Sequence, residues 1–127
     1  MFQAQAVFQN ISAMTITSFE ENINFSDDKI ITKVILESSF SKEIRILMKK
    51  GQIMKEHKTA FPITVHVLEG KIIFGVQGKS NLLEKGSIVS LEGNVPHDLT
   101  AKENSIVRLT LSKLDMVSRV KKVTENS

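Results

Sequence analysis

The pattern that most constrains this chain is a series of short segments, between residues 29 and 111, in which apolar and polar residues alternate. Glycine, asparagine or proline separates most of these segments, and valine, isoleucine and threonine dominate them. This composition is typical of strands with one buried face. No stretch in this region keeps a helical period for more than about two turns. The pattern therefore predicts eight or nine short strands in an all-β sandwich or barrel.

Turn signals such as Glu69-Gly70 and Lys85-Gly86 separate the expected strands, and no segment repeats elsewhere in the chain. We therefore predict one barrel and not two. The segments expected to form strands are 29–36, 43–48, 52–57, 62–68, 71–76, 80–84, 87–91, 97–100 and 105–111.

The two ends of the chain differ from this region. Residues 1–13 have the character of an N-terminal appendage, residues 14–112 of the barrel domain, and residues 113–127 of a basic C-terminal tail. Apolar residues recur every three positions in the tail. A short amphipathic helix and a frayed tail both stay open for this segment.

Composition excludes several classes of chemistry. The chain has no cysteine, which rules out disulfides, thiolate metal ligands and a cysteine nucleophile. Because a cysteine-free chain fits a reducing compartment, and the N-terminus lacks the basic and apolar regions of a secretory signal, we predict a cytoplasmic protein. No apolar run approaches the roughly 20 residues of a membrane-spanning helix, so no transmembrane segment is expected.

The net charge of +3 does not predict nucleic-acid binding, because 4 of the 17 basic residues and 2 of the 14 acidic residues lie in the tail. The rest of the chain holds 13 basic and 12 acidic residues. A nucleic-acid interface is expected to interleave basic and aromatic side chains, whereas this chain has no tryptophan or tyrosine. The basic tail is interpreted as a solvated segment.

Five residues carry the strongest motif. Gly51 precedes His57 by six positions, Gly70 closes the next strand, and Gly86 precedes a strand that leads to His97. This series resembles the two-motif signature of the cupin superfamily. The first motif is Gly, five residues, His-x-His, three or four residues, Glu, six residues and Gly. The second is Gly, five residues, Pro-x-Gly-x-x-His, three residues and Asn.

The resemblance covers roughly residues 25–111 and implies a small single-domain cupin of the RmlC-like type, with a double-stranded β-helix (jelly-roll-like) barrel and no assigned function. It also implies a homodimer, and pairing of exposed edge strands would favour one. The second motif departs from the family pattern at Glu92, Asn94 and Ala101, where the family has proline, glycine and asparagine.

The family's metal ligands are two histidines and a glutamate from the first motif and one histidine from the second. By position, His57 and His97 are present, whereas Thr59 replaces the second histidine and Ile63 (or Thr64, with the longer spacing) replaces the glutamate. Two neutral imidazoles leave most of the coordination sphere to water and offer no negative charge. The resemblance therefore implies an incomplete site, at which a divalent transition metal (Fe, Mn, Ni, Zn or Cu) would be weakly held.

An apolar pocket around the two histidines is expected to hold a small polar or amphipathic ligand. The alternative is a pair of histidines that only make hydrogen bonds inside the barrel. His66 is expected on the outer face of its strand, since side chains alternate along a strand. The predicted ligand-contacting residues are His57, Thr59, Ile63, Val65, His97 and Leu99.

Arg45 and Arg108 occupy the middle of two expected strands. They could reach an anionic ligand, but alternation in half-buried strands favours solvent-facing positions for both.

Two functions follow from these observations. The leading one is a small-ligand-binding, non-catalytic or vestigial cupin, because two of the four metal ligands are replaced. The alternative is a metal-dependent cupin enzyme, an oxygenase or isomerase, that uses His57 and His97. The sequence does not decide whether the chain is an enzyme, and the family's fold alone cannot decide it either.

Overall fold

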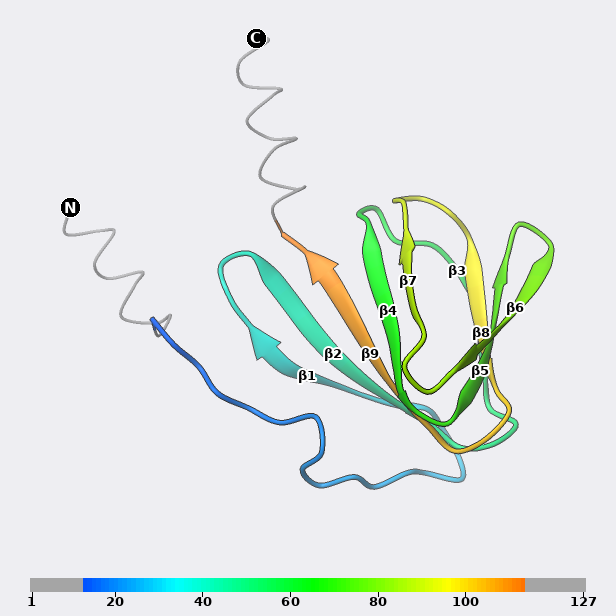
Figure 1. The fold of residues 1–127 in the computed structure, drawn as a ribbon, viewed down its shortest axis with the longest axis horizontal. Coiled ribbons are helices and arrows are strands. Elements are labelled where there is room, and N and C mark those ends of the chain that lie inside the picture. Colours follow the sequence, from blue (N-terminus) through cyan, green and yellow to red (C-terminus); the bar gives the residue numbers. More distant parts are fainter. Residues whose placement is uncertain (1–12, 114–127) are drawn as a thin grey trace, which may run out of the picture.

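The computed structural model describes residues 13–113, and these residues contain nine strands and no helix (Figure 1). Each predicted segment coincides with one strand, and the ends differ by no more than two residues. The strands are β1 (Ile31–Glu37), β2 (Ser41–Met48), β3 (Ile53–His57), β4 (Ile63–Glu69), β5 (Lys71–Val76), β6 (Lys79–Glu84), β7 (Ile88–Leu91), β8 (His97–Ala101) and β9 (Ser105–Ser112).

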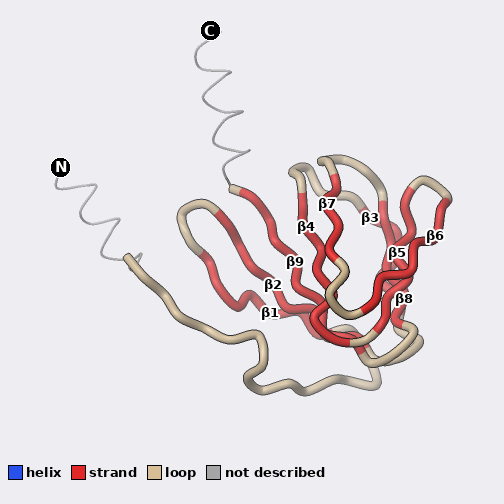
Figure 2. Tube along the Cα trace, in the orientation of Figure 1, coloured by secondary structure: helices blue, strands red, loops and turns tan. Residues whose placement is uncertain are grey.

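The strands form two sheets that pack face to face (Figure 2). One sheet has five strands in the order β1-β2-β9-β4-β7, and the other has four in the order β3-β8-β5-β6. Every pairing is antiparallel. Strands that are distant in the sequence, such as β2 and β9 or β3 and β8, are neighbours, as in a jelly-roll. The prediction of an all-β, double-stranded β-helix fold is therefore confirmed.

The core lies between the two sheets, where the alternating apolar residues meet. In β4, Ile63, Val65 and Val67 are buried, whereas Thr64 and His66 alternate with them and are only half-buried. His66 therefore lies on the outer face, as predicted. Most core residues are aliphatic, and the buried cluster comprises Ile46, Met48, Ile63, Val65, Val67, Ile72, Phe74, Leu83, Leu99, Ala101 and Val107.

The prediction that Arg45 faces solvent is wrong, because its side chain is only 3% exposed. The segment that precedes β1 folds back over the outer face of the five-stranded sheet. Nη1 of Arg45 donates hydrogen bonds to the backbone oxygens of Phe19, at 3.0 Å, and Glu21, at 2.7 Å. Nη2 donates a longer one, 3.4 Å, to the oxygen of Asn22. Alternation correctly predicted the outer face, but not the segment that covers it.

Beside Arg45, a small polar network crosses the same face. Nε of Arg108 and the hydroxyl of Thr110 each donate to Oε1 of Glu43 at 2.7 Å. The Arg108 guanidinium also lies 5.7 Å from the centre of the Phe19 ring. Burial alone would raise the pKa of the Glu43 carboxyl, but these two hydrogen bonds and the charge of Arg108 outweigh it and lower that pKa.

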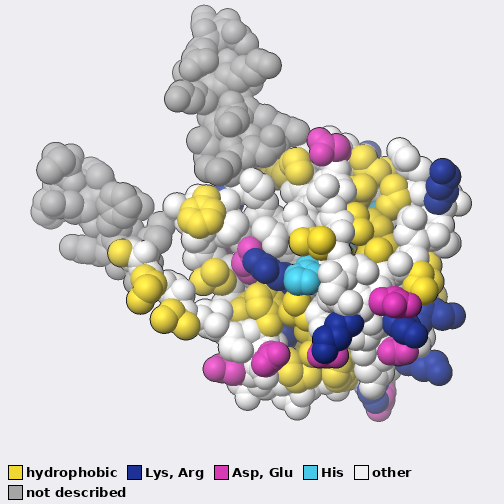
Figure 3. Space-filling view, viewed as in Figure 1, with side chains coloured by type: hydrophobic (Ala, Val, Ile, Leu, Met, Phe, Trp, Pro, Cys, Tyr) yellow, Lys and Arg dark blue, Asp and Glu magenta, His cyan; other side chains and the backbone are white. Residues whose placement is uncertain are grey.

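The space-filling view in Figure 3 shows hydrophobic and charged side chains mixed over one face of the molecule, with a histidine among them. Among residues 13–113, no helix is long and apolar enough to cross a membrane. The predicted appendage and C-terminal tail lie almost entirely outside this described range.

Candidate ligand site

His57 and His97, which are 40 positions apart in the sequence, are paired across strands β3 and β8. Their ring centres are 4.3 Å apart and the ring planes meet at 60°, an edge-to-face arrangement. The two environments differ, since His97 is only 2% exposed whereas His57 is exposed. The structure therefore brings together the two residues on which the sequence-based interpretation rests.

A β-bulge places His57 beside His97. Met54 pairs with Leu99 and His57 pairs with His97, so that two residues of β3, Lys55 and Glu56, lie opposite one residue of β8. Without the bulge, simple alternation would put Met54 and His57 on opposite faces. With it, both pair with buried residues of β8. Re-aiming of a side chain in this way is common beside binding sites.

Backbone carbonyls fix the orientation of both imidazoles. Nδ1 of His57 lies 2.8 Å from the oxygen of Lys55, and Nδ1 of His97 lies 2.9 Å from the oxygen of Val95. A carbonyl oxygen can only accept, so in each neutral ring the proton belongs on Nδ1. Nε2 is then the hydrogen-bond acceptor, and within the described part of the chain neither Nε2 has a hydrogen-bond partner.

Two loops that lead into β4 and β8 hold each other beside the histidines. The amide of Asn94 donates to the oxygen of Thr59 at 2.6 Å. At Gly93, a Cβ atom would lie 2.5 Å from the oxygen of Ala60, so only glycine fits without a shift. Asn94 has a φ of 65°, a left-handed conformation that asparagine tolerates better than most residues. The replacement of the family's glycine by Asn94 is therefore compatible with this turn.

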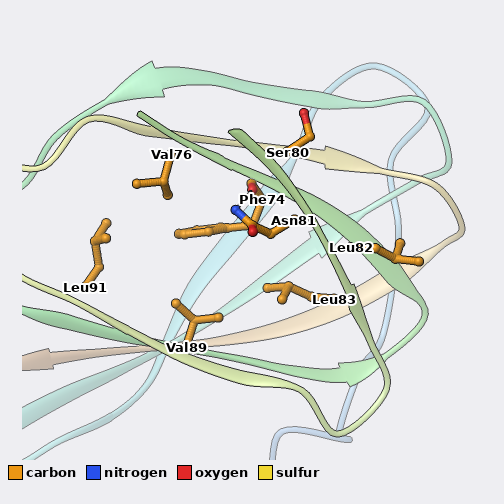
Figure 4. A pocket seen from close by; sticks show the side chains of 8 residues that line it. All are labelled: Phe74, Val76, Ser80, Asn81, Leu82, Leu83, Val89 and Leu91. Atoms are coloured by element: carbon orange, nitrogen blue, oxygen red, sulfur yellow. Dashed lines mark hydrogen bonds between the residues drawn. The ribbon is translucent and has the colours of Figure 1, made fainter. Parts of the chain in front are cut away.

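A cavity of about 610 Å³ opens between β5, β6 and β7, and neither His57 nor His97 lines it directly. Figure 4 shows that most of the labelled side chains surround one space, whereas Leu82 lies apart and is largely exposed. The cavity is lined by Phe74, Val76, Ser80, Asn81, Leu82, Leu83, Val89 and Leu91.

Phe74 connects this cavity to His97. Their rings are nearly parallel, at 24°, with centres 5.7 Å apart. Val76, another wall residue, pairs with His97 in the register of β5 and β8. Nδ2 of Asn81 donates to the backbone oxygen of Phe74 at 3.1 Å, which ties β6 to the same wall. Phe74 and Val76 thus join the cavity wall to His97.

The other predicted contact residues occupy different places. Ile63, Val65 and Leu99 belong to the buried core and do not line this cavity. Thr59 lies in the loop after β3, where its hydroxyl donates to the oxygen of Phe61 at 2.9 Å. The sequence-based interpretation did not include the cavity wall formed by β6 and β7. No residue of β6 gave a clear signal, because its sequence KSNLLE mixes polar and apolar residues.

The donor set does not fit a tightly held metal ion. His57 and His97 supply two neutral nitrogens, while the position of the family's glutamate is occupied by buried Ile63. The Thr59 hydroxyl is already engaged with the backbone. Among residues 13–113, no group of three or more His, Cys, Asp or Glu side chains could surround an ion. Structural and catalytic sites usually provide at least three protein ligands.

The chain was compared with protein families, curated proteins and solved structures, and only the solved structures show a similarity. No family model and no curated protein sequence matches the chain. The structure is similar to an RmlC-like cupin protein from Desulfovibrio desulfuricans, with a TM-score of 0.72, 22% identity, and coverage of 78% of this chain and 96% of that one.

Two other solved structures of cupins are also similar to this chain. An RmlC-like cupin family protein with a double-stranded β-helix fold from Methanocaldococcus jannaschii has a TM-score of 0.64 and 12% identity, covering 80% of this chain and 92% of that one. An RmlC-like cupin from Shewanella frigidimarina has a TM-score of 0.60 and 19% identity, covering 76% and 92%. The chain therefore has the fold of the small RmlC-like cupins, as its glycine and histidine spacing predicted.

Proposed function

We propose that this protein is a small-ligand-binding cupin whose cavity, together with His57 and His97, holds a small polar or amphipathic molecule without a tightly bound metal. The observation that carries the proposal is the hydrogen bonding of His97. This side chain is almost fully buried and stacks on the cavity wall, yet its Nε2 has no hydrogen-bond partner among the described residues.

The accessibility of the unpartnered Nε2 favours a ligand over a purely structural role. Among residues 13–113, the fully covered side-chain nitrogen and oxygen atoms without a hydrogen-bond partner are Nε of Arg45 and Nδ1 of His66, so Nε2 of His97 is not sealed by protein atoms. A purely structural role for His97 would ordinarily be accompanied by a protein partner at both nitrogens. A ligand that donates a hydrogen bond would supply the missing partner.

A cavity-filling variant tests this proposal. We expect neutral ring fragments to shift the methyl NMR signals of Val76, Leu83, Val89 and Leu91 saturably in the wild-type protein. Val89→Phe should abolish the shifts, because the new ring occupies the cavity. Ile88→Phe, at an exposed neighbour on the opposite face of β7, is the matched control and should retain them. Unchanged methyl signals with every fragment would contradict the proposal.

A metal titration separates this function from a metal-dependent oxygenase or isomerase. We expect untagged, metal-stripped protein to bind Mn, Fe, Ni, Cu or Zn no more tightly than a few micromolar by calorimetry, roughly −7 to −8 kcal/mol. A His57→Ala/His97→Ala variant identifies any heat that depends on the pair. Stoichiometric, tighter binding that this variant loses, with metal-dependent turnover of a substrate, would favour the enzyme instead.

We also propose that the protein is a cytoplasmic homodimer. The exposed edges of the two sheets, at β1, β7, β3 and β6, support the dimer, since unpaired strand edges are commonly covered by a partner. The cysteine-free composition supports the compartment. Light scattering that gives the monomer mass of 14.2 kDa at all micromolar concentrations would contradict the dimer, and fractionation of cells tests the location.

A further inference from the structure

Resting on the proposed function, we propose that the ligand is an uncharged ring compound that donates hydrogen bonds through a hydroxyl or N–H group, and is not a carboxylate, a phosphate or another anion. The chemistry of the cavity wall and of the histidine pair leads to this class.

The unpartnered ring nitrogens of the two histidines act as acceptors. Because the Nδ1 hydrogens of His57 and His97 are directed to backbone oxygens, the atom left to each neutral ring is the Nε2 lone pair. Asn81 uses one amide hydrogen on the oxygen of Phe74, which leaves its second amide hydrogen as a donor and Oδ1 as an acceptor. A ligand that carries a donor satisfies the two Nε2 atoms, whereas a carboxylate or phosphate oxygen would meet their lone pairs.

The cavity wall has no charge of either sign. Its lining comprises five aliphatic side chains, one phenylalanine, one serine and one asparagine. Moving an ion from water into such surroundings without a partner of opposite charge is strongly unfavourable. The wall therefore selects against anions and against cations, and favours an apolar body.

Lys79 is the one charged side chain that shares a transverse row with the histidines. The register aligns His57 with His97, His97 with Val76, and Val76 with Lys79. Lys79 is exposed at the end of the β5–β6 hairpin and does not line the cavity. A solvated surface lysine attracts an anion only weakly, and salt screens that attraction.

The shape of the wall favours a ring. Phe74 already stacks on His97, and Val76, Val89 and Leu91 surround the same space (Figure 4). Flat aromatic bodies gain contact area against such walls at a small entropic cost, and ring pairs contribute about 0.5–1.5 kcal/mol beyond their area.

Three small probes of nearly equal size test the class. Benzyl alcohol donates a hydrogen bond, benzyl methyl ether keeps the oxygen without the donor, and benzoate is an anion. Each is titrated at pH 8, where an ordinary imidazole is neutral, and followed through the methyl signals of Val76, Leu83, Val89 and Leu91. We expect benzyl alcohol to bind about tenfold more tightly than either of the other two.

Two variants show which groups produce this preference. His57→Phe/His97→Phe should keep the ring-binding cavity and reduce the alcohol-over-ether ratio to about one. If that variant does not fold, His57→Ala, at the exposed member of the pair, should reduce the ratio instead. Lys79→Ala is the matched control, and its ratios should equal those of the wild type.

The outcomes separate the two proposals. If all three probes bind and benzoate or the ether equals benzyl alcohol, the ligand class is wrong and the ligand-binding function stands. If the preference survives in the histidine variants, the histidines do not produce it and the inference is also wrong. If none of the probes moves the methyl signals, both the class and the proposed function are contradicted.

Discussion

This protein has two clusters of polar side chains that include buried residues. The clusters differ in how many of their polar atoms have a hydrogen-bond partner. On the outer face of the five-stranded sheet, Glu43, Arg45 and Arg108 lie under or beside the segment around Phe19, and most of their hydrogen bonds go to this chain itself. At the histidine pair, each ring is satisfied at Nδ1 only. In the first cluster, the fully covered side-chain atom that lacks a partner is Nε of Arg45, whereas in the second cluster Nε2 of both rings lacks one among the described residues.

The comparison teaches that burial of a polar side chain does not by itself identify a binding site. Arg45 is about as buried as His97, yet its donors hold a backbone segment in place. The outer face does contain two unpartnered atoms, Nε of Arg45 and Nδ1 of His66. Protein atoms cover both, whereas the histidine pair lies beside an open cavity. Access, together with a missing partner, separates a site from a structural network.

The largest expected effect comes from removing the anchor of the outer cluster. Arg45→Met keeps much of the side-chain length and loses the hydrogen bonds to Phe19, Glu21 and Asn22. We expect a loss of about 3 kcal/mol in the free energy of unfolding, measured with urea, because a buried charged donor is removed from three backbone carbonyl groups. Amide exchange across residues 18–22 should increase by at least tenfold.

Lys33→Met is the control for this change, because Lys33 pairs with Arg45 in the sheet register but is exposed. Its effect should stay within about 0.5 kcal/mol. Equal losses in the two variants would show that Arg45 does not anchor the segment.

A smaller effect, with a pH signature, is expected for Glu43→Gln. The folded-state pKa of Glu43 lies below the ordinary value of 4.5. Its contribution to stability is therefore complete well above pH 4.5 and is lost as the pH falls through the lower, folded-state pKa. We expect Glu43→Gln to cost about 1–2 kcal/mol at pH 7 and to flatten this acid limb of the stability curve.

Glu37→Gln is the natural comparison, because Lys113 lowers the pKa of Glu37 as well, through a hydrogen bond and its charge, but this carboxyl is exposed. Its change at pH 7 should be smaller than that of Glu43→Gln, since solvent screens surface pairs. An unaltered acid limb in Glu43→Gln would contradict the role given to the network.

The difference between the two clusters also shows how far sequence reasoning reaches. The strands were predictable because alternation is a local signal, and the glycine and histidine spacing then indicated the cupin fold. Arg45 was misplaced because its cover is contributed by Phe19 to Asn22, more than 20 positions away, with no periodicity to reveal it. Alternation could assign Arg45 to the outer face but could not show that this face is covered.

For the site, the spacing of the motif predicted that His57 and His97 lie together. The sequence could not show the bulge at Lys55 and Glu56, which turns His57 toward His97. The sequence also could not distinguish apolar residues that line a cavity from those that pack in the filled core. Val65 and Val89 are both apolar residues in paired strands, yet only Val89 lines the open space. That distinction depends on packing between strands that are distant in the sequence, which alternation within one strand does not encode.

Gly93→Ala tests the loops that lead into the site. Its Cβ would lie 2.5 Å from the oxygen of Ala60, so the two loops must separate. We expect a loss of about 1 kcal/mol in unfolding free energy, at the lower end for overpacked sites because these loops are partly exposed, and weaker binding of benzyl alcohol. Asn94→Gly, in the same turn, suits the left-handed backbone and should change stability by less than about 0.5 kcal/mol. A neutral Gly93→Ala variant would show that the loops tolerate separation.

The smallest effect on stability is expected at the histidine pair itself. His97→Phe keeps a ring against Phe74 and removes the unpartnered Nε2, which offsets the hydrogen bond lost between Nδ1 and the oxygen of Val95. The unfolding free energy should therefore change by less than about 1 kcal/mol, or even increase, because replacing an incompletely satisfied polar group by an apolar one of similar shape is nearly neutral. Binding of benzyl alcohol should fall about tenfold in the same variant. A large loss of stability with unchanged binding would contradict the distinction between the two clusters, since it would make His97 a structural residue like Arg45.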